Sequence, residues 1–280
     1  MTRSFRPLWV PCAGIIAAIC LATMPRITHA DVINLGDAGN YSVFALNQFQ
    51  YNGPGVINGD VAVGGGTNFA APAQINGTVF LNTGVPQQGN IVPTGGFVTT
   101  DLSQAISDAN NEAATLAALS PTQSLGTLGK NVTLTGNGGT NVVNVSGIKM
   151  TNGTLTLSGS ASDIFIINDS GKFSSSNSSI VLTGGVTANH VLFNVGGDVS
   201  ITGGGGNDFF GTILAPSSNV SVHDKTLTGE IIGLNISDTS GFKVNGTTAV
   251  PGPSPMAASA IFVLLVGLGI FWRQYTAKTA

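Results

Sequence analysis

A short phrase that alternates apolar and hydroxyl-bearing residues recurs along this chain, and it restricts the possible folds more than any other feature. The phrase reads VTLTG at 132–136 and returns as LTLSG at 155–159, IVLTG at 180–184, VSITG at 199–203 and VSV at 220–222. Successive side chains of a β-strand point to opposite faces, so the apolar residues would face a core and the hydroxyls would face solvent. One strand cannot bury its apolar face alone, whereas copies stacked ~4.8 Å apart would bury a continuous column.

Repeats of this length predict a β-solenoid whose coils each contain two or three short strands. A second series of apolar segments, at 164–167, 191–194, 212–214 and 230–232, is out of phase with the first series. We assign this second series to another face of the same coils. The predicted fold is therefore all-β dominated, a right-handed β-solenoid.

One segment, residues 101–120, breaks the strand pattern. Its apolar residues follow helical spacing at Leu102, Ile106, Ala109, Ala113, Leu116 and Ala117. Asp101 and Gln104 have the spacing of a capping box, and Pro121 would end the helix. The sequence predicts one α-helix over 101–119 that packs along the side of the solenoid through its small residues.

Composition excludes one class of partner. Only 8% of all residues are charged. Residues 31–249 contain all 13 acidic residues against five lysines and no arginine, which gives a net charge of −8. Binding to nucleic acid through phosphate neutralisation needs the opposite charge, so we do not expect a nucleic-acid partner.

Both ends of the chain have the features of targeting segments. Arg3 and Arg6 precede an apolar stretch, and Thr28-His29-Ala30 is a plausible cleavage site, so residues 1–30 are predicted to be a signal peptide. Residues 256–272 form an uncharged run that would make a helix ~25 Å long, followed by basic residues. We predict a transmembrane helix there, with a buried core helix as the alternative. The domains are then 1–30, 31–249 and 250–280.

Few residues of the exported part could carry catalysis. Ser221, His223 and Asp224 are close in sequence, but a hydrolase needs the base between the nucleophile and the carboxylate. On a strand, Asp224 would point away from His223 or lie in a turn, so we expect no enzymatic activity and no cofactor. The GGGGND segment at 203–208 is similar to calcium-binding turns, which leaves open whether Asp198 and Asp208 share a cation.

The outward residues of the repeated phrase are the candidate binding face. The rows predicted from the copies contain Thr133, Thr135, Thr156, Ser158, Val181, Thr183, Ser200, Thr202, Ser221 and His223. If the five copies stack, these side chains form two parallel rows of hydroxyls with little charge. Such an array would suit ice, although Thr and Ser also favour exposed strands for reasons unrelated to binding.

Several longer segments resemble a known family. They are VFALNQFQYNGPGVINGDVAVGGG at 43–66, LAALSPTQ at 116–123 and VLFNVGGDVSITGGGGNDFFGTILAPSSNVSV at 191–222. Together they resemble the choice-of-anchor A domain of bacterial surface proteins, over most of 33–246. A related pattern, including DAGNYSVFA at 37–45, is similar to the bacterial ice-binding family, whose fold is a β-solenoid with a helix alongside. The resemblance implies an adhesive role without catalysis.

The C-terminal tail resembles a PEP-CTERM sorting signal of Gram-negative bacteria. The matching residues are Val250, Pro251, Pro253 and Ser254, whereas Gly252 stands where that signal has Glu. This resemblance implies an exosortase-like sorting enzyme as a partner, and a location in the cell envelope or extracellular matrix. The combined prediction is an exported, membrane-anchored adhesive or structural protein that binds extracellular polysaccharide or another surface ligand. Ice binding is the alternative, and a polysaccharide-active β-helix enzyme is a third.

Overall fold

The computed structural model describes residues 33–70, 73–87, 89, 91–203, 208–238 and 240–246. The predicted signal peptide and the predicted C-terminal helix and sorting signal lie outside these residues. Among the residues described, there is no helix whose length and hydropathy would let it cross a bilayer.

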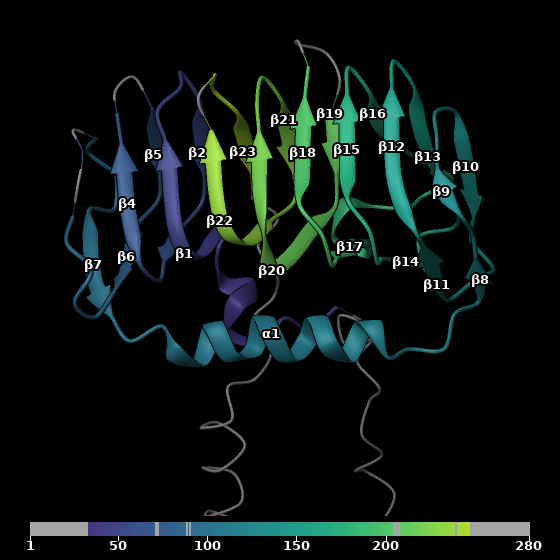
Figure 1. The fold of residues 1–280 in the computed structure, drawn as a ribbon, viewed down its shortest axis with the longest axis horizontal. Helices are drawn as coiled ribbons and strands as arrows, with labels where there is room; N and C mark the ends of the chain where they lie inside the picture. The colour runs from purple at the N-terminus through teal and green to yellow at the C-terminus, as the bar shows by residue number, and fades with distance from the viewer. Residues whose placement is uncertain are drawn as a thin grey trace, which may run out of the picture. The chain divides into compact units, whose positions relative to one another are not determined.

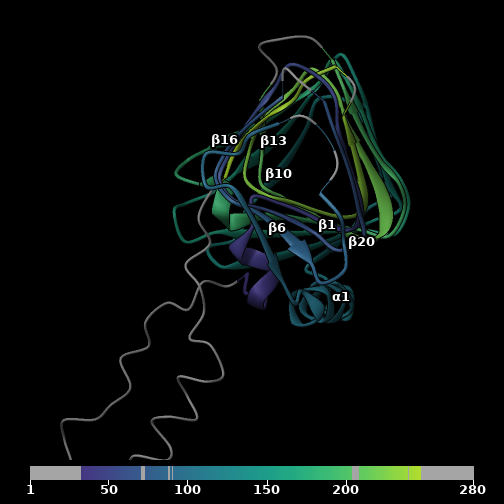
Figure 2. The ribbon, with the colours of Figure 1, turned by 90° about the vertical axis from the view of Figure 1, so that its left-hand side faces the viewer.

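The described residues form a parallel β-solenoid of about nine turns with one α-helix beside it (Figure 1). Each coil has three sides, which are seen end-on in Figure 2. The predicted all-β solenoid with a single accompanying helix is thus confirmed. We name the three sides the helix face, the serine face and the split face.

The helix face is the side against the α-helix. Its strands, in spatial order, are β7 (Phe97–Thr100), β6 (Val79–Asn82), β3 (Val61–Val63), β1 (Val43–Tyr51), β22 (Ile231–Asp238), β20 (Thr212–Val222), β17 (Val191–Val195), β14 (Ile164–Asp169), β11 (Thr140–Val145) and β8 (Gln123–Ser124). β1, β20 and β22 continue around a corner, and β1 and β20 each change register there against β22.

The serine face contains the second halves of these three long strands and lies toward the viewer in Figure 1. Its other strands are β4 (Gly66–Phe69), β18 (Val199–Thr202), β15 (Phe173–Ser176), β12 (Gly147–Thr151) and β9 (Thr127–Leu128). Together with the helix face it makes one 15-stranded sheet.

The split face consists of two separate sheets. The five-stranded sheet has the order β19 (Asp208–Phe210), β21 (Thr226–Thr228), β23 (Lys243–Asn245), β2 (Val56–Asn58) and β5 (Gln74–Asn76). The three-stranded sheet has the order β10 (Val132–Thr135), β13 (Thr154–Ser158) and β16 (Ser179–Thr183).

The coils are not stacked in the order of the sequence. β1 pairs with β3 on one side and with β22, near the end of the described chain, on the other. The chain first builds coils outward from β1 to β7, and α1 then carries it back along the helix face (Figure 1). The remaining coils run inward from β8 until the last one closes against the first.

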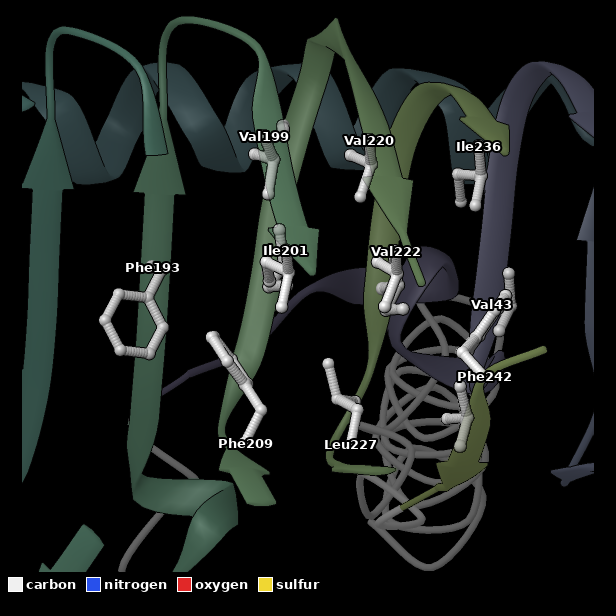
Figure 3. Close-up of a cluster of buried hydrophobic side chains, with 14 of the residues drawn as sticks. Val43, Phe193, Val199, Ile201, Phe209, Val220, Val222, Leu227, Ile236 and Phe242 are labelled. Atoms are coloured by element: carbon white, nitrogen blue, oxygen red, sulfur yellow. The ribbon is translucent and has the colours of Figure 1, made fainter. Parts of the chain in front are cut away.

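The core fills the inside of the coils. Val199, Val220 and Ile236 come from three neighbouring coils and lie side by side in Figure 3, because parallel pairing places them at the same register. All apolar residues of the repeated phrase that were predicted to point inward belong to this core or pack against it. The period-two prediction is therefore confirmed.

Helix α1 (Ser103–Ala117) confirms the predicted helix, and it buries Ala105, Ala109 and Leu116. These residues contact apolar side chains on the outer surface of the helix face, such as Leu192 and Leu214. Strands that are buried on both sides read as continuous apolar runs, which explains why this series lacks the alternation of the repeated phrase. Ala117, predicted in the buried stripe, is exposed.

Side chains hold the C-terminal end of α1, whereas its N-cap residue Leu102 forms no side-chain cap. The predicted capping box is not formed, because Gln104 Nε2 donates to Asp108 Oδ1 at 2.6 Å instead of reaching Asp101. Near the C-terminal end, Asn168 Nδ2 donates to the Leu116 carbonyl at 2.8 Å and Asn194 Nδ2 donates to the Ala113 carbonyl at 2.9 Å. These bonds tie the C-terminal half of α1 to strands β14 and β17 of the helix face.

Candidate binding face

The serine face carries a continuous row of polar side chains across seven neighbouring strands. These side chains point outward because their neighbours in each strand point into the core. The residues in register are Lys149, Ser174, Ser200, Ser221, Ser237, Gln50 and Asn68, and we call them the serine row. All seven are exposed or half-buried.

The serine row is regular in its centre. Ser174, Ser200, Ser221 and Ser237 occupy four successive strands, so their hydroxyls repeat at the strand spacing of ~4.8 Å. Lys149, at one end, is the charged member of the row. A row of short, uncharged donors and acceptors suits a ligand that repeats along its length and presents hydroxyl groups.

Two further rows flank the serine row. Thr151, Ser176 and Thr202 lie in register on one side. On the other side an amide ladder follows the corner, in which Asn235 Nδ2 donates to Asn219 Oδ1 and Asn47 Nδ2 donates to Asn235 Oδ1, both at 2.8 Å. The ladder links three coils, so it holds this edge of the face in a fixed register.

The split face is less regular. Its three-stranded part carries Thr133, Thr156 and Val181 in one row, and Thr135, Ser158 and Thr183 in the other. Its five-stranded part carries Asp208 next to Thr226, and Thr226 next to Lys243. Charges and the break between the two sheets interrupt any array on this side.

The prediction that all five copies of the phrase form one pair of rows is therefore wrong. Three copies lie on the split face, whereas the copies with Ser200, Thr202, Ser221 and His223 lie on the serine face. The cause is that strands on both faces have the same alternation. Sequence reasoning also missed Ser174, Ser237, Gln50 and Asn68, although the alternation in FSSS and NISD contained a signal for the two serines. Whether any of these residues binds a ligand stays a prediction.

A histidine and a buried carboxylate stand beside Ser221. His223 Nε2 lies 2.7 Å from Ser221 Oγ, and His223 Nδ1 lies 3.8 Å from Asp238 Oδ1. Burial raises the pKa of Asp238, whose side chain is fully enclosed. The sequence argument was right to set Asp224 aside, since that residue is exposed in a turn with a φ of 50°. It missed Asp238, which comes from the next coil.

The cation site left open by the sequence receives no support. Asp198 precedes a strand of the serine face and its carboxylate engages Asn219 and Lys172, whereas Asp208 begins a strand of the split face. Within the described ranges, no three His, Cys, Asp or Glu side chains gather in a way that could hold a metal ion.

Residues 72–244 match the family described as "Putative Ice-binding-like adhesive domain". The match covers more than half of the chain. This chain belongs to that family. The adhesive and ice-binding resemblance predicted from the sequence is confirmed, and no curated protein matches the chain.

Solved structures show the same fold as this ice-binding-like adhesive domain. An ice-binding protein from an Arctic yeast is 19% identical, with a TM-score of 0.55, and the alignment covers 79% of this chain and 97% of that one. An ice-binding protein from an Antarctic biological consortium is 21% identical, with a TM-score of 0.55 and coverage of 76% and 90%. One from an Antarctic Flavobacteriaceae bacterium is 24% identical, with a TM-score of 0.51 and coverage of 75% and 44%. At these identities the likeness concerns the fold.

Proposed function

We propose that this domain is an adhesive module that binds an extended extracellular ligand along its serine face. The observation that carries the proposal is the serine row, which runs without interruption across seven strands and has uncharged side chains in six of its positions. The family of ice-binding-like adhesive domains supports a function that rests on binding and not on turnover.

The chemistry of the row favours polysaccharide as the ligand. Serine hydroxyls and the amides of Gln50 and Asn68 both donate and accept hydrogen bonds, as sugar hydroxyls do. One such bond contributes only about 1 kcal/mol, because each partner also gives up a bond to water. A ligand that repeats along the row makes many bonds at once, so affinity grows with the length of the chain that is bound.

Anchoring at the cell envelope is part of the same proposal. The sequences of 1–30 and 250–280 support export followed by retention, with an exosortase-like enzyme acting on the tail and a helix at 256–272 in the membrane. An adhesive face is useful to a cell only if its domain stays attached to that cell.

Ice binding is the second candidate function. It is favoured by the regular hydroxyls of Ser174, Ser200, Ser221 and Ser237, and by solved structures of the same fold that are described as ice-binding proteins. We rank it second because Gln50 and Asn68 continue the row. Their longer side chains sample many rotamers, whereas a crystalline ligand needs a flat surface with fixed positions.

One pair of substitutions tests both candidates. Ser200→Tyr places a bulky ring in the middle of the serine row, whereas Thr156→Tyr places the same ring on the split face. We expect Ser200→Tyr to reduce retention on immobilised polysaccharide at least tenfold and Thr156→Tyr to leave it unchanged. Thermal hysteresis of the unsubstituted protein, lost in Ser200→Tyr, would establish ice binding instead. Equal effects of the two substitutions would exclude the serine face as the binding surface.

A further inference from the structure

Ser221, His223 and Asp238 stand in a line, and the proposed binding function uses only the first of them, as a member of the serine row. Ser221 lies one residue before the end of β20 at Val222, and His223 directly follows the strand, so the two side chains, two residues apart, reach the outer side of the serine face. Ser221 Oγ and His223 Nε2 are 2.7 Å apart, which is a short hydrogen bond. His223 Nδ1, on the other side of the ring, faces Asp238 Oδ1 at 3.8 Å.

The backbone fixes all three groups. Asp238 Oδ1 accepts hydrogen bonds from the backbone N–H groups of Ser240 at 3.0 Å and Gly241 at 2.9 Å. The His223 backbone N–H donates to the Ile201 carbonyl at 2.9 Å, so the residue is tied to the preceding coil. The coil that carries Asp238 is in register with β20, since Ser221 pairs with Ser237. The line therefore depends on the closing coil of the solenoid.

This arrangement favours one tautomer of the imidazole. A carboxylate that faces Nδ1 stabilises a proton on that nitrogen, so Nε2 is the nitrogen that can accept the proton of Ser221. A serine hydroxyl is a weak nucleophile until an adjacent base takes its proton. Ser174 and Ser200 belong to the same row but to other strands, and they offer internal controls for reactivity.

The surroundings of Ser221 suit a reaction at a carbonyl group. Ser200 and Ser237 flank it in register, at the strand spacing of ~4.8 Å, so two hydroxyl groups that can donate hydrogen bonds lie on either side of it. The face is open, which favours small acyl groups carried on an extended or freely diffusing molecule over a substrate that needs a deep pocket.

We propose that Ser221 is a nucleophile, activated by His223, which accepts an acyl group from carboxylic esters that reach the serine face. Ser221 Oγ forms a bond to the ester carbonyl carbon while its proton passes to His223 Nε2. The bond between that carbon and the alkoxy oxygen then breaks, and the departing alcohol takes the proton from His223. The products are acyl-Ser221 and a free alcohol, so the step needs no further reactant.

The test uses the full-length protein and p-nitrophenyl acetate, whose released p-nitrophenol is measured by absorbance. We expect up to one equivalent of p-nitrophenol per protein and an acetyl group on Ser221, located by peptide mass spectrometry. Ser221→Ala should abolish both signals, and His223→Gln should slow acetylation about 100-fold or more. Ser158→Ala, on the split face, is the matched control and should retain acetylation of Ser221. No acetyl group on Ser221, equal acetylation of Ser174, or an unchanged rate in His223→Gln would overturn the proposal.

A second measurement tests the positioning role of Asp238. Asp238 Oδ1 faces His223 Nδ1, so Asp238→Asn removes the charge that favours a proton on Nδ1. We expect the rate of Ser221 acetylation to fall about tenfold or more in Asp238→Asn, and Asp238→Glu, which keeps a carboxylate, to recover part of that loss. An unchanged rate in Asp238→Asn would overturn the positioning role of Asp238.

Discussion

Leu157→Ala is the sharpest test of the stacked core. Leu157 is fully buried in β13, the middle strand of its sheet, and lies in register with Leu134 and Leu182 on either side. Removing a fully buried leucine side chain costs about 2 kcal/mol in transfer free energy. The cavity that stays behind adds to this cost, because neighbours held by two ladders cannot move in to fill it. We expect a total loss of about 3 kcal/mol in the free energy of unfolding.

The assay is thermal unfolding followed by circular dichroism. For a domain of this size, 1 kcal/mol corresponds to a shift in Tm of about 2–4 °C, so Leu157→Ala should lower Tm by about 6–12 °C. Thr156→Ala, one residue away and pointing outward, is the control and should cost less than about 1 kcal/mol. Equal shifts for the two substitutions would refute the assignment of the strand faces.

Three further predictions concern the helix, the pH dependence and the tail. Asn194→Ala removes the bonds to the Ala113 carbonyl and to Asn168, so hydrogen exchange in the C-terminal half of α1 should become faster; unchanged exchange would contradict this anchoring. Hydrogen bonds from Asn141 and Ser160 lower the pKa of Asp163, so its contribution to stability is complete above the ordinary carboxyl pKa of about 3.9 and is lost as the pH falls below it. Asp163→Asn should flatten the acid limb of an unfolding curve, and an unaltered limb would show that other carboxylates control it. Deletion of 250–280 should move the protein from the membrane fraction to the soluble exported fraction, and retention in the membrane would exclude the tail as the anchor.

The two sides of each strand could be predicted from the sequence, but the face to which each strand belongs could not. Alternation fixes which residues point inward, because side chains of a strand have a period of two. The coils, however, differ in length, since β14 and β17 begin 27 residues apart and β17 and β20 begin 21 apart. VSITG begins 19 residues after IVLTG and was therefore expected to lie beside it. The strand that contacts β16, which contains IVLT, is instead β19, with the sequence DFF at 208–210.

The position of the last coil left a signal in the sequence, in three related turn phrases. The INGD, INGT and VNGT phrases contain Asn58, Asn76 and Asn245. In the structure these three asparagines form one ladder, with Asn58 Nδ2 donating to Asn245 Oδ1 at 2.9 Å and Asn76 Nδ2 donating to Asn58 Oδ1 at 2.8 Å. Similar turn phrases thus indicated neighbours in space. Asp238 had no comparable signal, because its approach to His223 depends on the register between two coils.

The closing coil determines how the domain would respond to tension. A solenoid that is pulled at an end coil can be peeled open one ladder at a time. Here the last described strand, β23, lies between β2 and β21, and β22 lies between β1 and β20. A force transmitted from the C-terminal side would enter the middle of the stack, where ladders on both sides of the coil have to break together. If the domain holds a cell to a surface, as proposed above, this geometry would replace gradual unzipping with a single high rupture force.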